Sequence, residues 1–282
     1  MECRPLGRTG EKIAAIGLGT WRIGGGMAPD YSHDREAIEA IRYAIELEMT
    51  HIDTAEIYGA GHAEELVGKA IKGFKRDDLF IATKVWYTNL RYDDVLKACE
   101  RSLKRLQTSY IDLYMIHWPS DRIPLSETMK AMERLYKEGK VRYIGVSNFS
   151  VSQIEEARSH LSTMDIVVNQ VKYNLYDREI ESRSMPYCFK NGITIVAYSP
   201  LAKGTLARDL EKSGNKRARL LRNLAEKYSK TPTQIALNWV IWHNQVIAIP
   251  KAIQKQHPEE NAGAAGWKLT KEDYEAVSKI WK

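Results

Sequence analysis

Short apolar segments alternate with amphipathic segments along most of the chain. The apolar segments lack the alternation of a half-exposed strand, so they predict strands buried on both faces, as in a parallel sheet covered by helices. These predicted strands are Ile16–Leu18, His51–Asp53, Leu79–Lys84, Ile111–His117, Val141–Ser147, Ile166–Gln170, Thr194–Tyr198 and Val246–Pro250. The amphipathic segments predict helices at Arg35–Glu48, Ala63–Gly73, Tyr92–Leu106, Leu125–Glu138, Ser152–Leu161, Ile180–Asn191, Thr233–His243 and Lys271–Trp281.

This regular alternation predicts a parallel α/β architecture. Eight units without a break in composition favour one domain over residues 1–282, a closed (β/α)₈ TIM barrel, over a doubly wound sheet. The GxGxxG turn of a Rossmann domain is also missing after the first strand. Residues before Ile13, with the turn GRTGEK, predict a β-hairpin that caps the bottom, or amino end, of the barrel. The stretch Leu201–Lys230 is predicted to be either an active-site loop or an extra helix.

Composition and charge exclude several classes of function. The net charge of +6 arises from basic residues interleaved with acidic ones, which is typical of solvated helix faces and gives no nucleic-acid motif. No apolar stretch is long enough to cross a bilayer, and the N-terminus lacks the pattern of a signal peptide. The three cysteines, Cys3, Cys99 and Cys188, are too widely spaced for a disulfide framework or a zinc motif. We therefore expect a cytoplasmic protein, monomeric, with neither a nucleic-acid nor a membrane partner.

Polar or ionisable residues stand where the predicted strands end. In a barrel, the carboxyl ends of the strands form the rim that carries the chemistry. The residues at these ends are Asp53, Lys84, His117, Ser147, Asn148, Gln170, Tyr198 and Lys251. Their placement predicts an active site at that rim.

Four residues of this rim suggest proton chemistry. Tyr58 follows Asp53 by five residues, so it lies on the loop above the rim. The pKa of a tyrosine is ordinarily about 10, and a nearby ammonium lowers it. Asp53 can pair with Lys84 and fix its direction, while His117 can donate a hydrogen bond to a substrate oxygen. Tyr58 would then be the proton donor to a developing alkoxide.

A set of ordered sequence segments extends this picture. They are GLGTW at Gly17–Trp21, HIDTAEIYG at His51–Gly59, ATKVW at Ala82–Trp86, LYMIHWP at Leu113–Pro119, GKVRYIGVSNF at Gly139–Phe149, NQVKYN at Asn169–Asn174, AYSPL at Ala197–Leu201, IPK at Ile249–Lys251 and EEN at Glu259–Asn261. With these segments the chain resembles the aldo-keto reductase family over essentially its whole length. The resemblance implies that Tyr58 is the general acid and that a nicotinamide cofactor supplies hydride, with no metal required.

The resemblance also implies contacts to the nicotinamide end of the cofactor. Ser147, Asn148 and Gln170 would hydrogen-bond the carboxamide, and Tyr198 would stack on the nicotinamide ring. An alternative for Tyr198 is that its ring simply closes the core.

Further residues match the parts of the family that hold the rest of the cofactor. Ser199 and Leu201 would contact the pyrophosphate side, and Glu260 and Asn261 would face the adenine.

The sequence departs from the family at the adenosine end. Members that prefer NADPH usually read IPKS, with an arginine six residues after the lysine. Here Lys251 is followed by Ala252, and His257 stands in the place of the arginine. Because an arginine and a lysine together neutralise a 2′-phosphate, their partial loss predicts a weakened preference for NADPH, with NADH also used.

The substrate pocket is predicted from three tryptophans beside rim segments, Trp21, Trp86 and Trp118. By the resemblance they are pocket-wall residues, although a tryptophan at a strand end can also be core filler. An aromatic wall around two polar donors suits an uncharged carbonyl compound. Arg22, beside Trp21, either attracts a carboxylate or is solvated.

Three functions fit these observations to different degrees. The leading one is NAD(P)H-dependent reduction of aldehydes or ketones, reversible as an alcohol dehydrogenase. The alternative is a cofactor-binding regulatory barrel without significant turnover. A third, a barrel hydrolase with a metal on His51 and Asp53, lacks enough further ligands because Lys84 is a cation and His117 stands alone on its strand.

Overall fold

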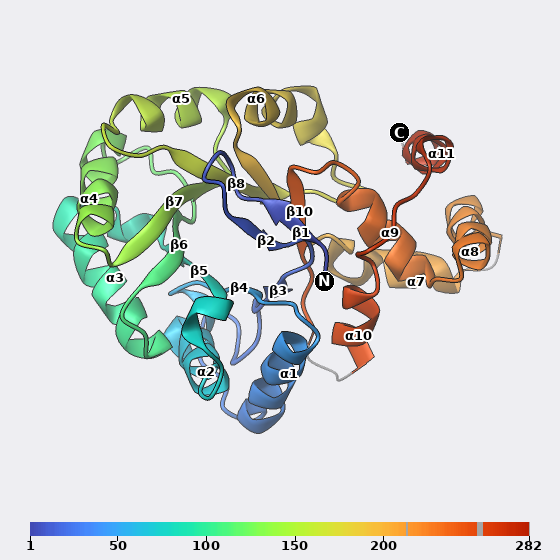
Figure 1. Cartoon of the computed structure of the whole chain (residues 1–282), viewed down its shortest axis with the longest axis horizontal. Coiled ribbons are helices and arrows are strands. Elements are labelled where there is room, and N and C mark those ends of the chain that lie inside the picture. The colour runs from blue at the N-terminus through green and yellow to red at the C-terminus, as the bar shows by residue number, and fades with distance from the viewer. Residues whose placement is uncertain (213, 253–255, 282) are drawn as a thin grey trace.

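The computed structural model describes residues 1–212, 214–252 and 256–281 (Figure 1). Eight parallel strands form one sheet in the order β10-β9-β8-β7-β6-β5-β4-β3. Their bounds are β3 Leu18–Gly19, β4 His51–Asp53, β5 Phe80–Val85, β6 Ile111–Ile116, β7 Val141–Ser147, β8 Ile166–Lys172, β9 Thr194–Tyr198 and β10 Val246–Ile249. Parallel bridges from Ile16 to Ala248 and from Gly19 to Lys251 join the first segment to the last, so the predicted (β/α)₈ barrel is confirmed.

Glycines in the first strand segment allow this closure. A Cβ atom on Gly17 would lie 2.7 Å from the carbonyl oxygen of His51, and one on Gly19 would lie 2.7 Å from that of Ile249. Both distances are far below a normal contact, so the neighbouring strands approach a backbone that has no side chain. The regular strand β3 is short, and before it Ile16 pairs with Ala248 through a single bridge while the N–H of Gly17 donates to the carbonyl oxygen of Ala248.

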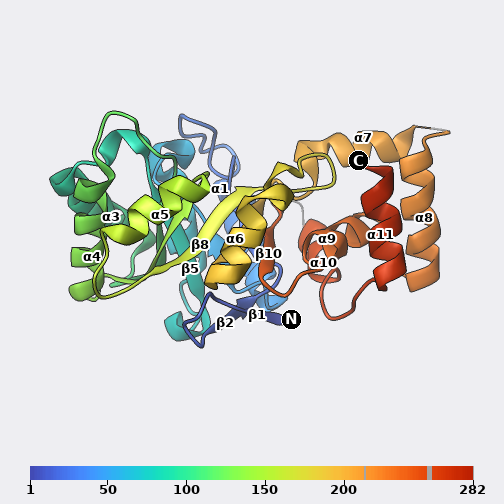
Figure 2. The same cartoon turned by 90° about the horizontal axis from the view of Figure 1, so that it is seen from above.

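The predicted N-terminal hairpin is also confirmed. Strand β1 (Cys3–Pro5) pairs antiparallel with β2 (Lys12–Ala14). The side chains of Leu6 and Ile13 are buried in one cluster with interior barrel residues such as Phe80 and Leu113. The hairpin therefore caps the amino end of the barrel, where Figure 2 shows it beneath the strands.

Helices cover the outside of the barrel. They are α1 Asp34–Glu46, α2 His62–Ala70, α3 Tyr92–Leu106, α4 Leu125–Lys137, α5 Val151–Ser159, α6 Ser184–Asn191 and α9 Pro232–Val240. Capping boxes start two of them, with Ser150 before α5 and Thr231 before α9. Short 3₁₀ turns are η1 Tyr58–Gly61, η2 Arg76–Asp78, η3 Tyr87–Asn89, η4 Glu179–Ser182 and η5 Ala202–Gly204.

The largest difference in helix bounds concerns α6, which begins at Ser184 and not at Ile180. Arg183 has φ −140° and ψ −61°, which separates the turn η4 from the helix. Pro186 then lies in the first turn of α6, where the missing N–H of a proline costs no helical hydrogen bond.

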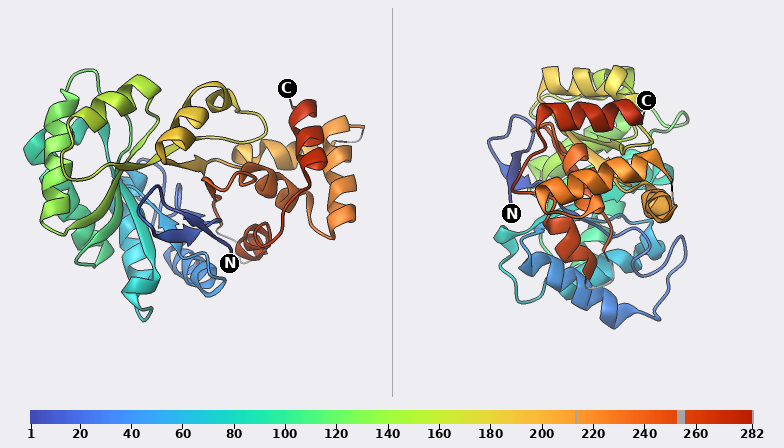
Figure 3. Two further views of the ribbon diagram at one scale, coloured as in Figure 1. Left: turned by 45° about the horizontal axis from the view of Figure 1, so that its top comes forward. Right: turned by 90° about the vertical axis from the view of Figure 1, so that its right-hand side faces the viewer.

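The stretch Leu201–Lys230 contains two extra helices, α7 (Thr205–Glu211) and α8 (Lys216–Tyr228). The extra-helix alternative is therefore correct. Helix α8 packs on α9 and on α11 (Lys271–Ile280), and Figure 3 shows α8 and α11 side by side at the edge of the molecule. A further helix, α10 (Gln256–Ala262), was not predicted from the sequence.

Candidate active site

An ion pair inside the carboxyl end of the barrel is the centre of the site. Lys84, on β5, places its Nζ 2.7 Å from Oδ1 of Asp53, on β4, and 2.8 Å from the carbonyl oxygen of Thr54. Both side chains are almost fully buried. Adjacent parallel strands bring these residues together, because Asp53 pairs with Ala82 in the register of the sheet.

Tyr58 lies above this pair on the turn η1. Its hydroxyl oxygen is 3.5 Å from the Nζ of Lys84. The turn can place it there because Gly59 and Gly61 have positive φ angles of 55° and 101°. The tyrosine ring lies edge-on between the rings of Trp21, at 4.9 Å, and His117, at 5.6 Å. The four residues that the sequence suggested for proton chemistry are thus brought together.

The direction of the Tyr58 pKa differs from the sequence expectation. Burial raises this pKa, and the ammonium of Lys84 only partly offsets the effect. The phenol therefore keeps its proton at neutral pH, as a proton donor must. Burial lowers the pKa of Lys84, but the charges and hydrogen bonds of Asp53 and Tyr58 together outweigh it, so the pKa of Lys84 is raised.

His117 is neutral in this site. Burial, with a smaller effect from Lys84, lowers its pKa to about 2. Among the described residues, its buried Nδ1 atom has no hydrogen-bond partner. The ring of Trp86 contacts the other side of the imidazole, with the centroids 5.1 Å apart. A neutral imidazole can donate one hydrogen bond to a substrate oxygen without competing for the proton of Tyr58.

Gln170 has a contact that the sequence did not suggest. Its Nε2 donates to Oδ2 of Asp53 at 2.7 Å, so both carboxylate oxygens of Asp53 are used. The carbonyl oxygen of the Gln170 backbone accepts from the hydroxyl of Ser147 at 2.9 Å. The catalytic pair and the predicted nicotinamide contacts are therefore one connected network.

Asn148 and Tyr198 are joined in this network. The Asn148 amide nitrogen donates to the backbone oxygen of His117 at 3.1 Å and to the Ser147 hydroxyl at 3.0 Å. Its Oδ1 accepts from the Tyr198 hydroxyl at 2.9 Å. These three hydrogen bonds hold the Asn148 side chain in place. Asn148 therefore fixes the orientation of the Tyr198 ring beside the barrel mouth. Its φ of 62° suits an asparagine better than most residues.

The residues suggested for the pyrophosphate side lie on the loop after β9. Ser199 has a positive φ of 49°, and its carbonyl oxygen accepts from the side-chain amide of Asn174 at 3.0 Å. Leu201, two residues later, is partly buried against the core. Asn174 was not singled out from the sequence, although it ends the segment NQVKYN.

Lys251 lies at the closure of the barrel, next to the loop that follows β3. It bridges Gly19, and its pKa is lowered by burial and by the nearby charge of Arg22. Neither cation has an acidic partner among the described residues. Arg22 and Lys251 therefore form a small positive area beside the mouth, which suits the phosphates of a dinucleotide.

The residues suggested for the adenine end of the cofactor differ in whether their polar groups already have partners. Asn261, on α10, is buried, and among the described residues its amide nitrogen has no partner. This orphan donor fits an acceptor of a bound adenine. Glu260 instead accepts from the hydroxyl of Thr231 at 2.6 Å, so its carboxylate is engaged with the cap of α9. His257 is exposed near the start of the same helix.

The three predicted pocket tryptophans all lie at the mouth. Trp21 and Trp118 are 37% and 42% exposed, which is high for such large apolar side chains, and Trp86 is partly exposed. Tyr87, not singled out from the sequence, extends this wall with its ring 4.8 Å from that of Trp86. Glu56, also missed, anchors the wall by accepting from the backbone N–H of Trp86 at 2.6 Å.

The His51 and Asp53 pair is not arranged as a metal site. His51 lies inside the barrel below Asp53, and burial lowers its pKa to about 4. The ammonium of Lys84 occupies the position beside the Asp53 carboxylate. Within the described residues, no group of three or more histidine, cysteine, aspartate or glutamate residues could hold a metal ion.

In the same part of the chain, no helix has the length and apolar character that crossing a bilayer requires.

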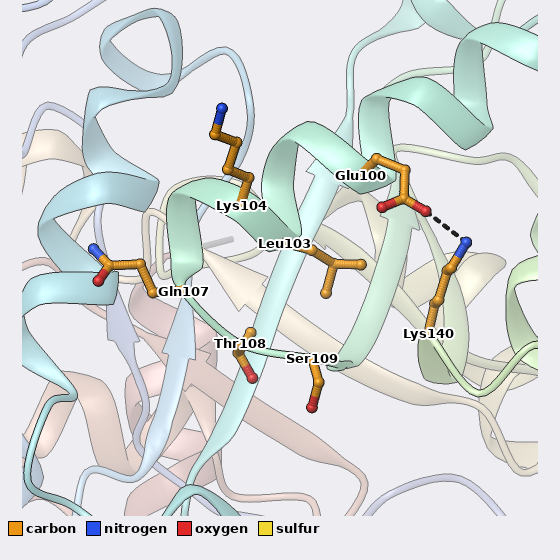
Figure 4. Close-up of a pocket in the computed structure, with 7 residues that line it drawn as sticks. All are labelled: Glu100, Leu103, Lys104, Gln107, Thr108, Ser109 and Lys140. Atoms are coloured by element: carbon orange, nitrogen blue, oxygen red, sulfur yellow. Dashed lines mark ion pairs between the residues drawn. The ribbon is translucent and has the colours of Figure 1, made fainter.

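A surface pocket of 470 Å³ lies far from this site, where α3 turns toward β6 (Figure 4). It is lined by Glu100, Leu103, Lys104, Gln107, Thr108, Ser109 and Lys140. Glu100 and Lys140 neutralise each other across it at 2.5 Å. The pocket opens at the amino end of the barrel, away from the rim that carries Tyr58.

Comparisons with known proteins agree with this geometry. The model of the aldo/keto reductase family matches residues 15–282. The aldo-keto reductase YhdN of Bacillus subtilis is 36% identical, over 99% of this chain and 93% of the relative. The methylglyoxal reductase YeaE of Escherichia coli is 37% identical, over 95% and 91%.

Solved structures give the same result. The thermostable aldo-keto reductase Tm1743, in complex with the inhibitor epalrestat, is 49% identical with a TM-score of 0.93, over 99% of this chain and 100% of that one. An aldo/keto reductase of Klebsiella pneumoniae in complex with NADP and acetate is 36% identical with a TM-score of 0.87, over 100% and 96%. The chain therefore belongs to the aldo/keto reductase family, a family of oxidoreductases with solved structures in complex with NADP.

Proposed function

We propose that this protein reduces aldehydes and ketones with NADPH, and that Tyr58 donates the proton to the carbonyl oxygen. The observation that carries the proposal is the buried Tyr58 hydroxyl 3.5 Å from the Lys84 ammonium, which Asp53 holds at 2.7 Å. A tyrosine kept protonated by burial, next to a fixed positive charge, is suited to protonate an oxygen that becomes negative during the reaction.

Each residue of the site has a separate task in this proposal. The neutral ring of His117 donates a hydrogen bond to the carbonyl oxygen and orients it toward Tyr58. A bound nicotinamide supplies the hydride. As Tyr58 gives up its proton, the Lys84 ammonium stabilises the phenolate, and Asp53 keeps Lys84 charged and in place. In the reverse direction the phenolate accepts the proton of an alcohol, so the protein also acts as an alcohol dehydrogenase.

The cofactor is proposed to lie across the mouth beside the network of Ser147, Asn148, Gln170 and Tyr198. Ser147 and Gln170 offer polar groups for the carboxamide, and the ring of Tyr198 offers a surface for stacking. Ser199 and Leu201, with the cations Arg22 and Lys251, would hold the phosphates, and Asn261 would donate to the adenine. We propose that NADPH is used with NADH as a second cofactor, because His257 replaces an arginine.

For the substrate, we propose small uncharged carbonyl compounds, including 2-oxoaldehydes, taken with broad specificity. Support comes from the aromatic wall of Trp21, Trp86 and Trp118 at the mouth, whose side chains are apolar and partly exposed. Relatives named methylglyoxal reductase and glyoxal reductase are 37% identical to this chain. We further propose a monomer in the cytoplasm, in line with the free thiols of Cys3, Cys99 and Cys188.

The test is the substitution Tyr58→Phe, which removes only the hydroxyl. Turnover of methylglyoxal with NADPH is expected to fall at least about 10³-fold, within the range for the loss of a general acid, while the Kd for NADPH stays within about 2-fold. The control is Tyr114→Phe. That hydroxyl is fully buried in β6 and has no partner among the described residues, so its loss is expected to change neither quantity.

Retained turnover in Tyr58→Phe would overturn the role of this residue. A wild-type protein that binds NADPH but reduces no member of a panel of aldehydes and ketones would instead favour the regulatory barrel.

A further inference from the structure

The segment between β3 and α1, residues 20–33, lies directly on the turn that carries Tyr58; we call it the first loop. The backbone N–H of Gly59 donates to the carbonyl oxygen of Gly26 at 2.7 Å. A Cβ atom on Gly59 would lie 2.3 Å from the carbonyl oxygen of Gly24, so the two backbones touch. Trp21 belongs to the same loop and contacts the ring of Tyr58. The position of the first loop therefore determines what surrounds the Tyr58 hydroxyl.

His62 fastens this loop to α2. It is 3% exposed and directly follows the turn of Tyr58. Its Nε2 lies 2.7 Å from Oδ1 of Asp34, the first residue of α1, and its Nδ1 lies 3.0 Å from Oε2 of Glu65. Ionised carboxylates only accept hydrogen bonds, so a ring nitrogen of His62 is the donor where it faces one of them. The bond to Asp34 ties the far end of the first loop to the helix that begins beside Tyr58.

The loop also packs on the faces of the imidazole. The ring of Tyr31 lies 4.3 Å from that of His62. A Cβ atom on Gly24 would lie 2.8 Å from Cδ2 of His62, so the glycine backbone rests against the ring. His62 thus contacts the first loop at Gly24 and Tyr31, and the beginning of α1 at Asp34.

We infer that His62 is a positioning residue for the proposed carbonyl reduction. Its hydrogen bond to Asp34 and its ring contacts with Gly24 and Tyr31 hold the first loop against the Tyr58 turn. Its hydrogen bond to Glu65, on the same helix, fixes the ring, and together these contacts set the Tyr58 hydroxyl and the Trp21 ring. The inference rests on the proposed function of Tyr58. Without these bonds, the first loop moves away from Gly59, and the proton donor and the pocket wall both lose their fixed places.

Loss of the His62 hydrogen bonds is expected to change catalysis and not the stability of the whole barrel. The side chains of Asp34 and Glu65 are 27% and 46% exposed, so water can solvate either carboxylate when the imidazole is absent. Loss of the bonds is therefore local to the first loop. It changes the rate of the chemical step and the KM for the carbonyl, and leaves the barrel and the cofactor contacts on the later strands in place.

The test compares His62→Phe, which keeps a ring against Tyr31 but no hydrogen bond, with Asp34→Ala, which removes the partner on α1. Single-turnover reduction of methylglyoxal by the NADPH complex avoids a limit set by product release. Because a misplacement of about 1 Å can cost about 10²-fold, a loss of about 10-fold or more is expected in both variants. The KM for the carbonyl is expected to rise about 3-fold, and the Kd for NADPH to change less than about 2-fold.

Two further variants make the result specific. Asp34→Asn keeps an acceptor for the imidazole, so it is expected to restore most of the single-turnover rate lost in Asp34→Ala. Arg158→Gln removes a comparable exposed pair with Asp165 on the other side of the barrel and is expected to keep the wild-type rate.

Wild-type rates in both His62→Phe and Asp34→Ala, with an active wild-type enzyme, would overturn the inference while leaving the proposed function intact. An inactive wild-type enzyme would instead overturn the proposed function. If His62→Phe does not fold, Asp34→Ala alone decides, because its side chain is partly exposed and lies at the surface end of α1.

Discussion

Asp112 at the amino end of the barrel and Asp53 at the carboxyl end are both buried carboxylates, and they differ in what surrounds them. At the amino end, Asp112 accepts from Arg76 at 2.6 Å, from the backbone N–H of Ile81 at 2.9 Å and from Arg142 at 2.7 Å. At the carboxyl end, Asp53 is bonded as closely, to Lys84 and Gln170. The groups beyond Asp53 differ: Tyr58 is 3.5 Å from Lys84, and the Nδ1 of His117 has no partner among the described residues.

This difference distinguishes a carboxylate that only stabilises the fold from one that belongs to a reactive site. The amino-end network is closed, because Arg142 also binds Glu11 on the hairpin and Arg76 is used by the backbone oxygens of Leu79 and Tyr110. The carboxyl-end network ends in donors that face the mouth. A buried ion pair by itself says little about function, since such pairs are often only structural. Partly unsatisfied groups at the end of a well-ordered network are the stronger sign of a reactive site.

The strongest test of this comparison replaces one cation beside each carboxylate, Lys84 beside Asp53 and Arg76 beside Asp112, with methionine. In Lys84→Met, carbonyl reduction is expected to fall about 10³-fold, because the phenolate of Tyr58 loses its stabilising charge. The measurement is single-turnover reduction with NADPH, with the Kd for NADPH measured alongside. Turnover within about 10-fold of wild type would show that the Lys84–Asp53 pair is structural, like its counterpart.

The matched change at the amino end is Arg76→Met. It is expected to lower the free energy of unfolding by about 2–4 kcal/mol, because Asp112 keeps Arg142 but loses one buried partner. Activity per folded molecule is expected to remain within about 2-fold of wild type. Thermal unfolding and kinetics on the same sample check both parts. A large loss of kcat without loss of stability would contradict the division between the two ends.

Much of the fold could be predicted, because buried parallel strands and amphipathic helices give clear and different patterns. The helix α10 could not, since the sequence QHPEENA is short, polar and contains Pro258. In the extra segment, Asn215 caps α8, but basic residues interrupt the apolar positions of its sequence KRARLLRNLAEKY, so the helical pattern is weak.

That Asp53, Lys84, Tyr58 and His117 lie together could be predicted from the sequence, but not all of their contacts could. Residues at strand ends meet at one rim by the geometry of the barrel, so Asp53, Lys84 and His117 could be grouped from the sequence. The bond from Gln170 to Asp53 joins residues 117 positions apart, and no local pattern specifies it. The sign of the Tyr58 pKa shift also depends on burial by neighbouring loops, which outweighs the nearer and more easily predicted charge of Lys84.

The pH dependence sharpens the same comparison at the carboxyl end. Reduction needs protonated Tyr58, so it is lost only as the pH rises through a pKa that burial places above the usual value of about 10. Alcohol oxidation needs the phenolate and is expected to rise toward alkaline pH. The pKa of His117 is lowered to about 2, so no inflection from it is expected between pH 5 and 9. Profiles of kcat/KM for wild type and His117→Gln check this. An inflection near pH 6–7 that disappears in the variant would contradict a neutral His117.

The smallest expected effect concerns the preference between NADPH and NADH, which depends on the cations at the carboxyl end of the barrel. Arg76 and Arg142 are committed to Asp112, whereas Arg22 and Lys251 have no acidic partner among the described residues and are free to meet phosphates. If His257 is a weak replacement for an arginine, His257→Arg should raise the ratio of kcat/KM for NADPH to that for NADH by about 5-fold, about 1 kcal/mol, as expected of an exposed charge pair. His257→Gln is the control and should leave the ratio nearly unchanged. A wild-type ratio that is already very large and does not respond to His257→Arg would show that Lys251 and Arg22 alone select NADPH.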